Sequence, residues 1–125
     1  MYIFNRKVFT LDDFNNSLND TIKSTDNFDD GVYLNPKEVA LKQKYIQFND
    51  LFIKFMILDL DQENSAMNWD LVGLPSPNIV VKNKLNGRCH YIYALESPIC
   101  NTVNARWRPI AYFERIKNAY TQKLN

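Results

Sequence analysis

Two aspartates at the end of an apolar segment are the residues in this sequence best suited to bind a metal ion. Asp59 and Asp61 close the segment 51–61, which is otherwise rich in aliphatic and aromatic residues. Such a segment predicts a strand that is buried on both sides, at the centre of a sheet. Because side chains alternate between the two faces of a strand, we expect the two carboxylates to project together, about 7 Å apart at Cα.

Two like charges at the rim of a buried strand disfavour each other's ionised form unless a cation lies between them. Carboxylate oxygens are hard ligands, which favour Mg²⁺ or Mn²⁺. A pair of such ions can activate a 3′-hydroxyl and stabilise a departing pyrophosphate, as nucleotidyl transfer requires. The simpler alternative is that the strand ends here and its acids contact solvent. A DxD sequence alone does not decide between the two.

A single histidine lies in a second candidate strand, beside an arginine. His90 is the only histidine of the chain, and Arg88 shares its face of the strand by the same alternation. The two side chains could bind a nucleoside triphosphate, with the guanidinium as a forked donor. A purely structural histidine is the alternative. One histidine excludes a zinc site built from several, and Cys89 faces away from His90, which excludes a Cys–His catalytic pair.

Composition limits the class of protein. The chain has 125 residues, of which 46% are hydrophobic and 14% aromatic. These values predict one folded domain over 1–125 and exclude a disordered chain. No apolar run approaches the roughly 20 residues of a membrane helix, so we expect no membrane contact. With two cysteines and no signal-peptide core, we expect a reduced, cytoplasmic protein.

The charges divide unevenly along the chain. Residues 1–79 contain 7 Lys/Arg and 12 Asp/Glu, whereas residues 80–125 contain 8 and 2. A basic second part can contact the phosphates of a nucleic acid, although ordinary solvated faces explain the same pattern. The residues that we expect along template or primer phosphates are Lys82, Lys84, Arg106, Arg108 and Arg115.

The elements that must position these residues follow an α+β pattern. Asn86-Gly87 predicts a type I′ turn, with positive φ at both central residues, between strands over 78–83 and 88–95. Capping signals at Thr10 and Asn35 predict two early helices. Helices are expected over 11–19, 36–46, 65–72 and 107–124. We therefore predict an α+β domain with a mostly antiparallel sheet and flanking helices.

In order and spacing, these motifs resemble the plasmid replicase family, which comprises replication initiators of the colicin-plasmid type within the archaeo-eukaryotic primase superfamily. The resemblance covers residues 31–125 and leaves 1–30 as a poorly defined segment. The motifs are Asp59-Leu60-Asp61, a helix with Trp69, Leu74-Pro-Ser-Pro-Asn-Ile-Val-Val81 and Asn86-Gly-Arg-Cys-His-Tyr-Ile-Tyr-Ala-Leu95.

The resemblance implies a primase-like fold, with an RRM-like catalytic sheet joined to an N-terminal α/β unit. It implies that Asp59 and Asp61 bind metal and that His90 contacts the phosphates of the incoming nucleotide. Family members synthesise a primer at a plasmid origin, which a separate C-terminal region selects. The third motif of the family supplies another carboxylate, and no acid follows Glu114 here. The chain is therefore expected to be either a fragment of a longer replicase or a short relative with weak catalysis or none.

Three functions remain open. The first is the metal- and nucleotide-binding part of a plasmid or phage primase that acts on a single-stranded DNA template or origin DNA. The second is a primase-like protein without catalysis that binds and inhibits a host nucleic-acid machine. Trp107 and Tyr112 are candidates for its contact surface, although helical spacing favours the core for Trp107. The third is an RRM-like RNA binder, which Asp59 and Asp61 disfavour because they would repel phosphates.

Overall fold

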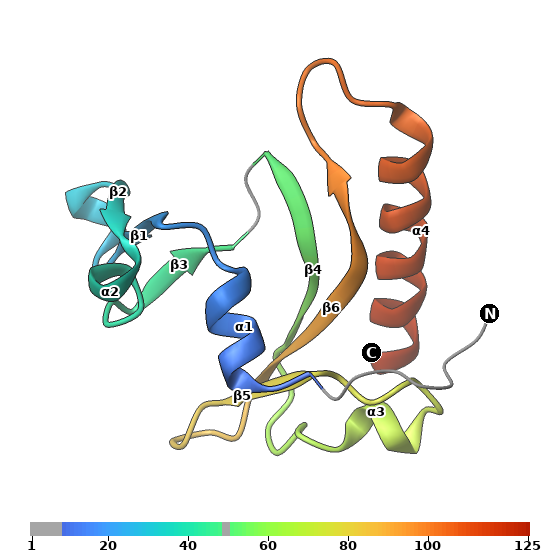
Figure 1. Cartoon of the computed structure of the whole chain (residues 1–125). Coiled ribbons are helices and arrows are strands. Elements are labelled where there is room, and N and C mark those ends of the chain that lie inside the picture. Colours follow the sequence, from blue (N-terminus) through green and yellow to red (C-terminus); the bar gives the residue numbers. More distant parts are fainter. Residues whose placement is uncertain (1–8, 49–50) are drawn as a thin grey trace. The chain divides into compact units, whose positions relative to one another are not determined.

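The chain folds into two compact units, Met1–Phe48 and Asn49–Asn125 (Figure 1). The computed structural model describes residues 9–48 and 51–125. Each unit contains an antiparallel sheet with helices, which confirms the predicted α+β class. The single domain expected over 1–125 stays a prediction. Within the described ranges, none of the helices combines the length and the apolar character that a membrane span requires.

The first unit is built on a sheet of strand order β2-β1-β3 in which both pairings are antiparallel. Its first helix has the predicted capping box, since Thr10 and Asp13 each accept the other's backbone N–H with their side chains. Asn35, expected as the second N-cap, lies instead in a strand. The elements are α1 (Leu11–Ser17), β1 (Thr21–Thr25), the 3₁₀ helix η1 (Phe28–Asp30), β2 (Tyr33–Pro36), α2 (Lys37–Ala40) and β3 (Tyr45–Gln47).

The helix predicted over 36–46 is wrong beyond its first turn. Helix α2 ends at Ala40, and the chain then turns so that the Lys44 N–H donates to Asp26 Oδ1 at 2.9 Å. Residues 45–47 pair with β1 and form β3. Their aromatic and β-branched side chains favour an extended backbone. Pairing with β1 therefore overrides the helix that the capping signal at Asn35 predicts.

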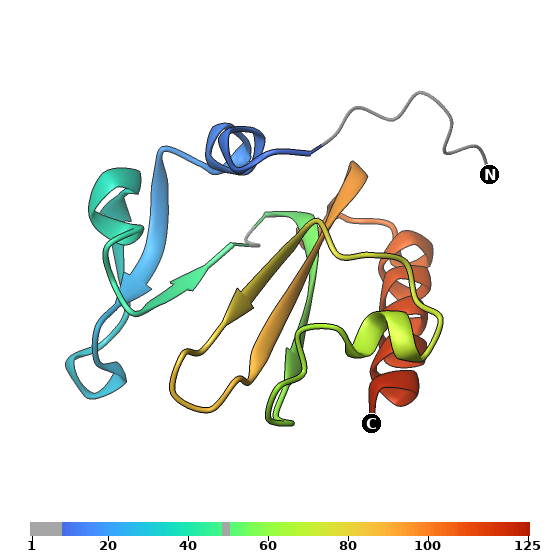
Figure 2. The same cartoon turned by 90° about the horizontal axis from the view of Figure 1, so that it is seen from below.

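The second unit contains a sheet of strand order β4-β6-β5, again with antiparallel pairings. Figure 2 shows β6 (orange) between β5 and β4. The long helix agrees with the one expected over 107–124, and the short one lies inside the range 65–72. The elements are β4 (Phe52–Leu60), α3 (Asn68–Leu71), β5 (Ile79–Lys82), β6 (Cys89–Cys100) and α4 (Trp107–Leu124).

The central strand of this sheet is not the one that the sequence predicts. Strand β4 lies at the edge of the described sheet, and β6 lies at its centre. Three consecutive residues of β6, Tyr91, Ile92 and Tyr93, are buried. In β4, by contrast, burial alternates near the end, so that Leu58 and Leu60 are buried and Asp59 is exposed. A strand packed on both faces shows the continuous pattern, and here β6 has it.

Strands β5 and β6 form the predicted hairpin, but the turn is not type I′. Lys82 pairs with Cys89, so the connecting loop comprises residues 83–88. Gly87 has a φ of 71°, whereas Asn86 is not among the described residues with positive φ. The Asn83 N–H donates to the Arg88 carbonyl at 2.9 Å, and the Gly87 N–H donates to the Asn83 carbonyl at 2.8 Å. The longer loop therefore needs the left-handed backbone only at its glycine.

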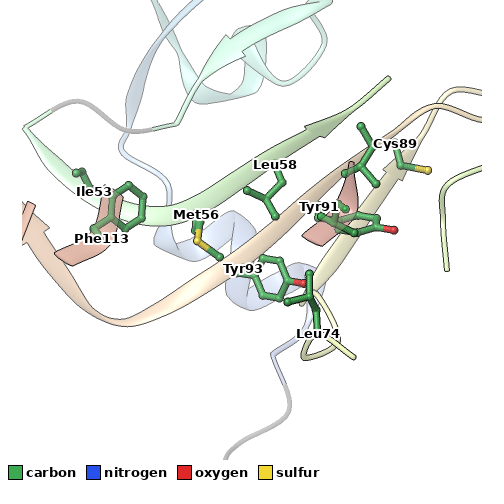
Figure 3. Close-up of a cluster of buried hydrophobic side chains, with 10 residues drawn as sticks. Ile53, Met56, Leu58, Leu74, Cys89, Tyr91, Tyr93 and Phe113 are labelled. Atoms are coloured by element: carbon green, nitrogen blue, oxygen red, sulfur yellow. The ribbon is translucent and has the colours of Figure 1, made fainter. Parts of the chain in front are cut away.

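The core of the second unit lies on the face of the sheet that α4 covers. Leu58 of β4 is paired with Tyr91 of β6, and Met56 is paired with Tyr93. Phe113 of α4 packs against this cluster (Figure 3). Neighbouring residues of a strand point to opposite faces. Asp59 and His90, one position along from Leu58 and Tyr91, are therefore directed away from the core and from α4.

Two tyrosine hydroxyls fasten the segment between β4 and β5 onto the core. Tyr91 O–H donates to the Ser65 carbonyl, and Tyr93 O–H donates to the Pro75 carbonyl at 2.8 Å. Burial raises the pKa of both phenols above the ordinary value. Both side chains thus have a packing role.

Candidate functional site

Asp59 and His90 come together across the β4–β6 ladder. They are directly opposite each other in the strand pairing, and His90 Nε2 lies 3.0 Å from Asp59 Oδ1. Both side chains are exposed, at 69% for Asp59 and 57% for His90. Their attraction adds little stability at this exposure. The β4–β6 register, rather than this attraction, places a carboxylate and an imidazole side by side at the surface.

Cys89 does not take part in this arrangement. Its thiol is fully buried in the core of the second unit, whereas His90 is exposed on the opposite face of β6. The prediction that the two side chains cannot act as a catalytic pair is confirmed. Both cysteines of the described chain are free thiols.

Asp61 lies one position beyond the end of β4. It is exposed and follows Leu60, the last residue of the strand. By strand parity Asp59 and Asp61 belong to one side, but Asp61 is already in the loop and does not line the hollow described next. Asp59 thus has a fixed strand position, whereas the backbone of Asp61 is outside the ladder.

A surface hollow of about 440 Å³ lies beside the Asp59–His90 pair. One wall comes from β4, and the others come from the β5–β6 hairpin. The hollow brings together four of the predicted site residues. Asp59, Arg88 and His90 are expected at a metal and nucleotide site, whereas Lys82 is expected to contact nucleic acid. The lining residues are Asp59, Val81, Lys82, Asn83, Asn86, Arg88 and His90.

The hairpin side of the hollow is rich in hydrogen-bond donors. Asn83 Oδ1 accepts from the Leu85 N–H, and Asn86 Oδ1 accepts from the Arg88 N–H, both at 2.9 Å. With their carbonyl oxygens engaged, these amides present their NH₂ groups. Lys82 and Arg88 add two cations. The hairpin therefore suits an anion, and Asp59 opposite suits a cation.

Sequence reasoning missed Asn83 and Asn86 as site residues. The sequence predicts a turn at Asn86 and the end of a strand at Asn83, and it assigns neither residue to the site. One feature of the sequence could have indicated them. The side-chain oxygen of an asparagine in a turn can accept a hydrogen bond from the backbone N–H two residues further along the chain. That ability fixes an amide group at a hairpin that also contains Arg88 and His90.

The loop after Asp61 is in close contact with the hairpin. Ser65 N–H donates to the Gly87 carbonyl at 3.2 Å. A Cβ placed on Gly87 would lie 2.6 Å from Asn64 Oδ1 and 2.7 Å from the Asn64 backbone nitrogen. Only a glycine permits this approach. The contact couples the loop that contains Asp61 to the loop that contains Arg88.

Asp59 and Asp61 are the residues that could hold a metal ion. Within the described ranges, no group of three or more His, Cys, Asp or Glu side chains is arranged to bind one. Mg²⁺ commonly uses one or two carboxylates together with substrate phosphates, and it does not need a cage made entirely of protein. Asp59, which lines the donor-rich hollow, fits this mode of binding, and Asp61 is the second carboxylate just beyond the end of β4.

The other predicted basic residues lie in two places. Lys84 is exposed in the 83–88 loop but does not line the hollow. Arg106, Arg108 and Arg115 lie at the start of α4 or within it, and they are exposed. Because α4 covers the core face of the sheet, these arginines are on the other side of the second unit from Asp59 and His90. The structure therefore does not gather the five basic residues into one surface.

The position of Trp107 on α4 also differs from the prediction. Helical spacing favours a core position, but its side chain is 71% exposed. At 3.6 residues per turn, Trp107 lies about 120° around the helix from Phe113, which marks the buried side. Spacing by threes and fours from Ile110 onward is a core pattern, whereas Trp107 lies at its margin.

Comparison with known proteins agrees with the motifs. A scan against protein-family models matches residues 17–125 to the Replicase family. Searches of curated proteins and of solved structures found no match. The matched region begins in the first unit, upstream of residue 31, where the motifs begin. It includes the whole hollow and all of α4.

Proposed function

Because the chain belongs to the Replicase family, we propose that it is the metal- and nucleotide-binding part of a replication initiator that synthesises a primer. Its superfamily would be that of the archaeo-eukaryotic primases. The reaction would be nucleotidyl transfer on single-stranded template DNA at a plasmid or phage origin. The observation that carries the proposal is the Asp59–His90 pair at the edge of a hollow that also contains Lys82 and Arg88.

The residues divide into two roles under this proposal. Asp59 and Asp61 would hold Mg²⁺ or Mn²⁺, which when bound lowers the pKa of an attacking 3′-hydroxyl and neutralises a departing pyrophosphate. His90 and Arg88 would hold the triphosphate, with Lys82 as an additional cation. The register of β4 against β6 sets the separation of the two groups. Positioning of the triphosphate next to the carboxylates is the contribution of the fold to the reaction.

The donor-rich hairpin supports the same division. A triphosphate is a polyanion, and charge-assisted hydrogen bonds from Arg88 and Lys82 are stronger than neutral ones. The NH₂ groups of Asn83 and Asn86 add neutral donors without additional charge. A protein that bound only a metal ion would not need these cationic and amide donors on the hairpin. We therefore assign nucleotide and metal to adjacent parts of one site.

Calorimetry of ATP binding in the presence of Mn²⁺ tests the proposal. The wild type is compared with the Asp59→Asn, Asp61→Asn double variant, which keeps size but removes charge. Asp70→Asn is the matched control, because Asp70 is an exposed acid on α3 outside the hollow. We expect metal-dependent binding in the wild type and in the control, and its loss in the double variant. Equal binding by all three proteins would contradict the assignment.

A second candidate function is a primase-like protein without catalysis that binds a host nucleic-acid machine. The observation in its favour is the exposure of two large aromatic side chains, Trp107 at 71% and Tyr112 at 68%. In that case the Asp59→Asn, Asp61→Asn variant would keep its biological effect, for example inhibition of host replication. Loss of the effect in that variant would exclude this candidate. Either function suits the cytoplasm, where the two free thiols stay reduced.

A further inference from the structure

The outer side of α4 presents two aromatic rings with arginines between them. We define the α4 outer face by Trp107, Arg108, Tyr112 and Arg115. Trp107 and Tyr112 are 71% and 68% exposed, and both arginines are exposed. Phe113 and Leu124, on the other side of the helix, are buried in the core. The α4 outer face therefore has no role in holding the helix onto the sheet.

Both charged residues that define this face are basic, although the exposed Glu114 lies only about 20° around the helix from Trp107. Glu114 is the sole acid of α4, whereas basic residues lie along the whole helix. In the described part of the chain, neither Arg108 nor Arg115 is in an ion pair. The Arg108 guanidinium lies 5.6 Å from the centroid of the Trp107 ring, so the cation and the ring already form one surface. An anionic partner with flat apolar groups complements such a face.

From these features we propose that the α4 outer face binds single-stranded nucleic acid, with Trp107 and Tyr112 stacking on bases and Arg108 and Arg115 contacting phosphates. The inference deepens the proposed function and rests on it for the identity of the strand, a template or primer. Stacking on exposed aromatic rings beside basic groups is how many proteins bind single strands without sequence preference.

Helical geometry supports two separate stacking positions. Trp107 and Tyr112 are five residues apart, which corresponds to a rise of about 7.5 Å along the axis. Successive nucleotides of one strand are 3.4 Å apart along the axis of duplex DNA, so the two rings are farther apart along the helix than two neighbouring stacked bases. The rings also diverge by about 140° around the helix, with the two arginines between them. They are therefore suited to different bases of one strand rather than to both sides of a single base.

A duplex fits the face less well. Its bases are already stacked and paired, so exposed rings can reach them only after the bases have been separated. A single strand offers free base faces and the same phosphates. The face also lies on the opposite side of the second unit from Asp59 and His90, so strand binding here does not require an occupied nucleotide site.

Fluorescence anisotropy with a labelled oligothymidylate, without metal or nucleotide, tests the proposal. The variants are Trp107→Ala, Tyr112→Ala and the ring-preserving pair Trp107→Phe, Tyr112→Phe. Tyr33→Ala, which removes a tyrosine of similar exposure (64%) from the first unit, is the matched control. We expect each alanine to weaken binding roughly five-fold to a hundred-fold, whereas the phenylalanine pair and the control stay close to wild type. Unchanged melting temperatures verify the fold.

The salt dependence separates the arginines from the rings. In Arg108→Gln, Arg115→Gln the slope of log K against log salt should fall by about 0.7 for each phosphate that an arginine no longer neutralises. Wild-type affinity in both Trp107→Ala and Tyr112→Ala would overturn the proposal, as would absence of oligothymidylate binding by the wild type. So would equal binding of a duplex. The Asp59→Asn, Asp61→Asn variant should bind the oligonucleotide normally. If the proposed nucleotide site is wrong, the ATP experiment fails while oligonucleotide binding is unchanged, so the two proposals can be tested separately.

Discussion

The contact between Gly87 and Asn64 predicts an unusually costly glycine substitution. Gly87 has a φ of 71°, which an alanine adopts only with strain. Its Cα also faces the Asn64 backbone and side chain so closely that an added Cβ would lie within 3.0 Å of three of their atoms. Gly87→Ala therefore carries two penalties, one from the backbone conformation and one from steric overlap.

The structure provides a control that separates the two penalties. Gly73 has a similar φ of 76°, but a Cβ there would have no atom within 4 Å. Gly73→Ala should cost only the left-handed backbone, about 1–2 kcal/mol. Gly87→Ala should cost this amount plus about 1–3 kcal/mol of overpacking. The sum, about 2–5 kcal/mol, is a large share of the roughly 5–15 kcal/mol that stabilises a typical domain.

Urea unfolding followed by tryptophan fluorescence measures the difference in stability between the two variants within the second unit. Both tryptophans, Trp69 and Trp107, lie in the second unit, and Trp69 is partly buried against its core. The fluorescence therefore reports on the unit that contains the hollow. We expect the midpoint of Gly87→Ala to fall well below that of Gly73→Ala, with a similar dependence on urea concentration.

A second substitution checks the cause. Asn64→Gly removes the side-chain oxygen that lies 2.6 Å from the added Cβ, but it leaves the backbone nitrogen at 2.7 Å. Asn64 itself has a φ of 55°, so glycine at this position relieves backbone strain in either background. Asn64→Gly should therefore raise stability more in Gly87→Ala than in the wild type, without recovering all of the loss. If Gly87→Ala and Gly73→Ala prove equally destabilising, or if Asn64→Gly gives no recovery, the loop after Asp61 is not held against the hairpin as described.

Two further predictions concern single side chains of β6 and the loop before it. Arg88→Gln should weaken Mn²⁺-dependent ATP binding about ten-fold or more, since hydrogen bonds to charged groups contribute about 1.5–3 kcal/mol, and calorimetry against Arg106→Gln as control measures it. Burial, with smaller contributions from Tyr120 and Tyr91, raises the pKa of Tyr93. The folded state thus retains the phenol proton to higher pH than the unfolded state, so this contribution to stability is complete below about pH 10 and falls above it. Melting temperatures measured across this range should fall less steeply in Tyr93→Phe than in the wild type, and equal slopes would contradict this assignment.

Local patterns predict most elements of the second unit because each has its own signal. The near-continuous apolar run over 51–61 predicts β4, and Asn86-Gly87 predicts the hairpin of β5 and β6. The spacing of Ile110, Phe113 and Leu124 predicts α4. The 36–46 helix fails because a strand partner at β1, which no local pattern reveals, makes an extended backbone more favourable for 45–47. A single sequence does not carry signals that depend on a distant partner.

The candidate site likewise depends partly on local patterns and partly on the pairing of distant strands. Strand parity predicts which face Asp59 and His90 occupy, but it does not predict which strand lies next to β4. The neighbour is β6 and not the preceding strand β5, and the β4–β6 register places His90 directly opposite Asp59. The family resemblance supplies what parity lacks, because it links the two motifs before any pairing is known.

The central position of β6 explains why metal ligands and phosphate ligands can be adjacent in so small a unit. One face of β6 packs Tyr91 and Tyr93 into the core, and the other presents His90. Strand β4 then supplies Asp59 from one side, and the β5–β6 hairpin supplies Lys82 and the asparagine amides from the other. In the order β5-β4-β6, with β4 central, β6 would still lie beside Asp59, but it would be separated from β5 and Lys82. The central position of β6, paired with both β4 and β5, is thus what gives the carboxylate and the hairpin a common boundary at His90.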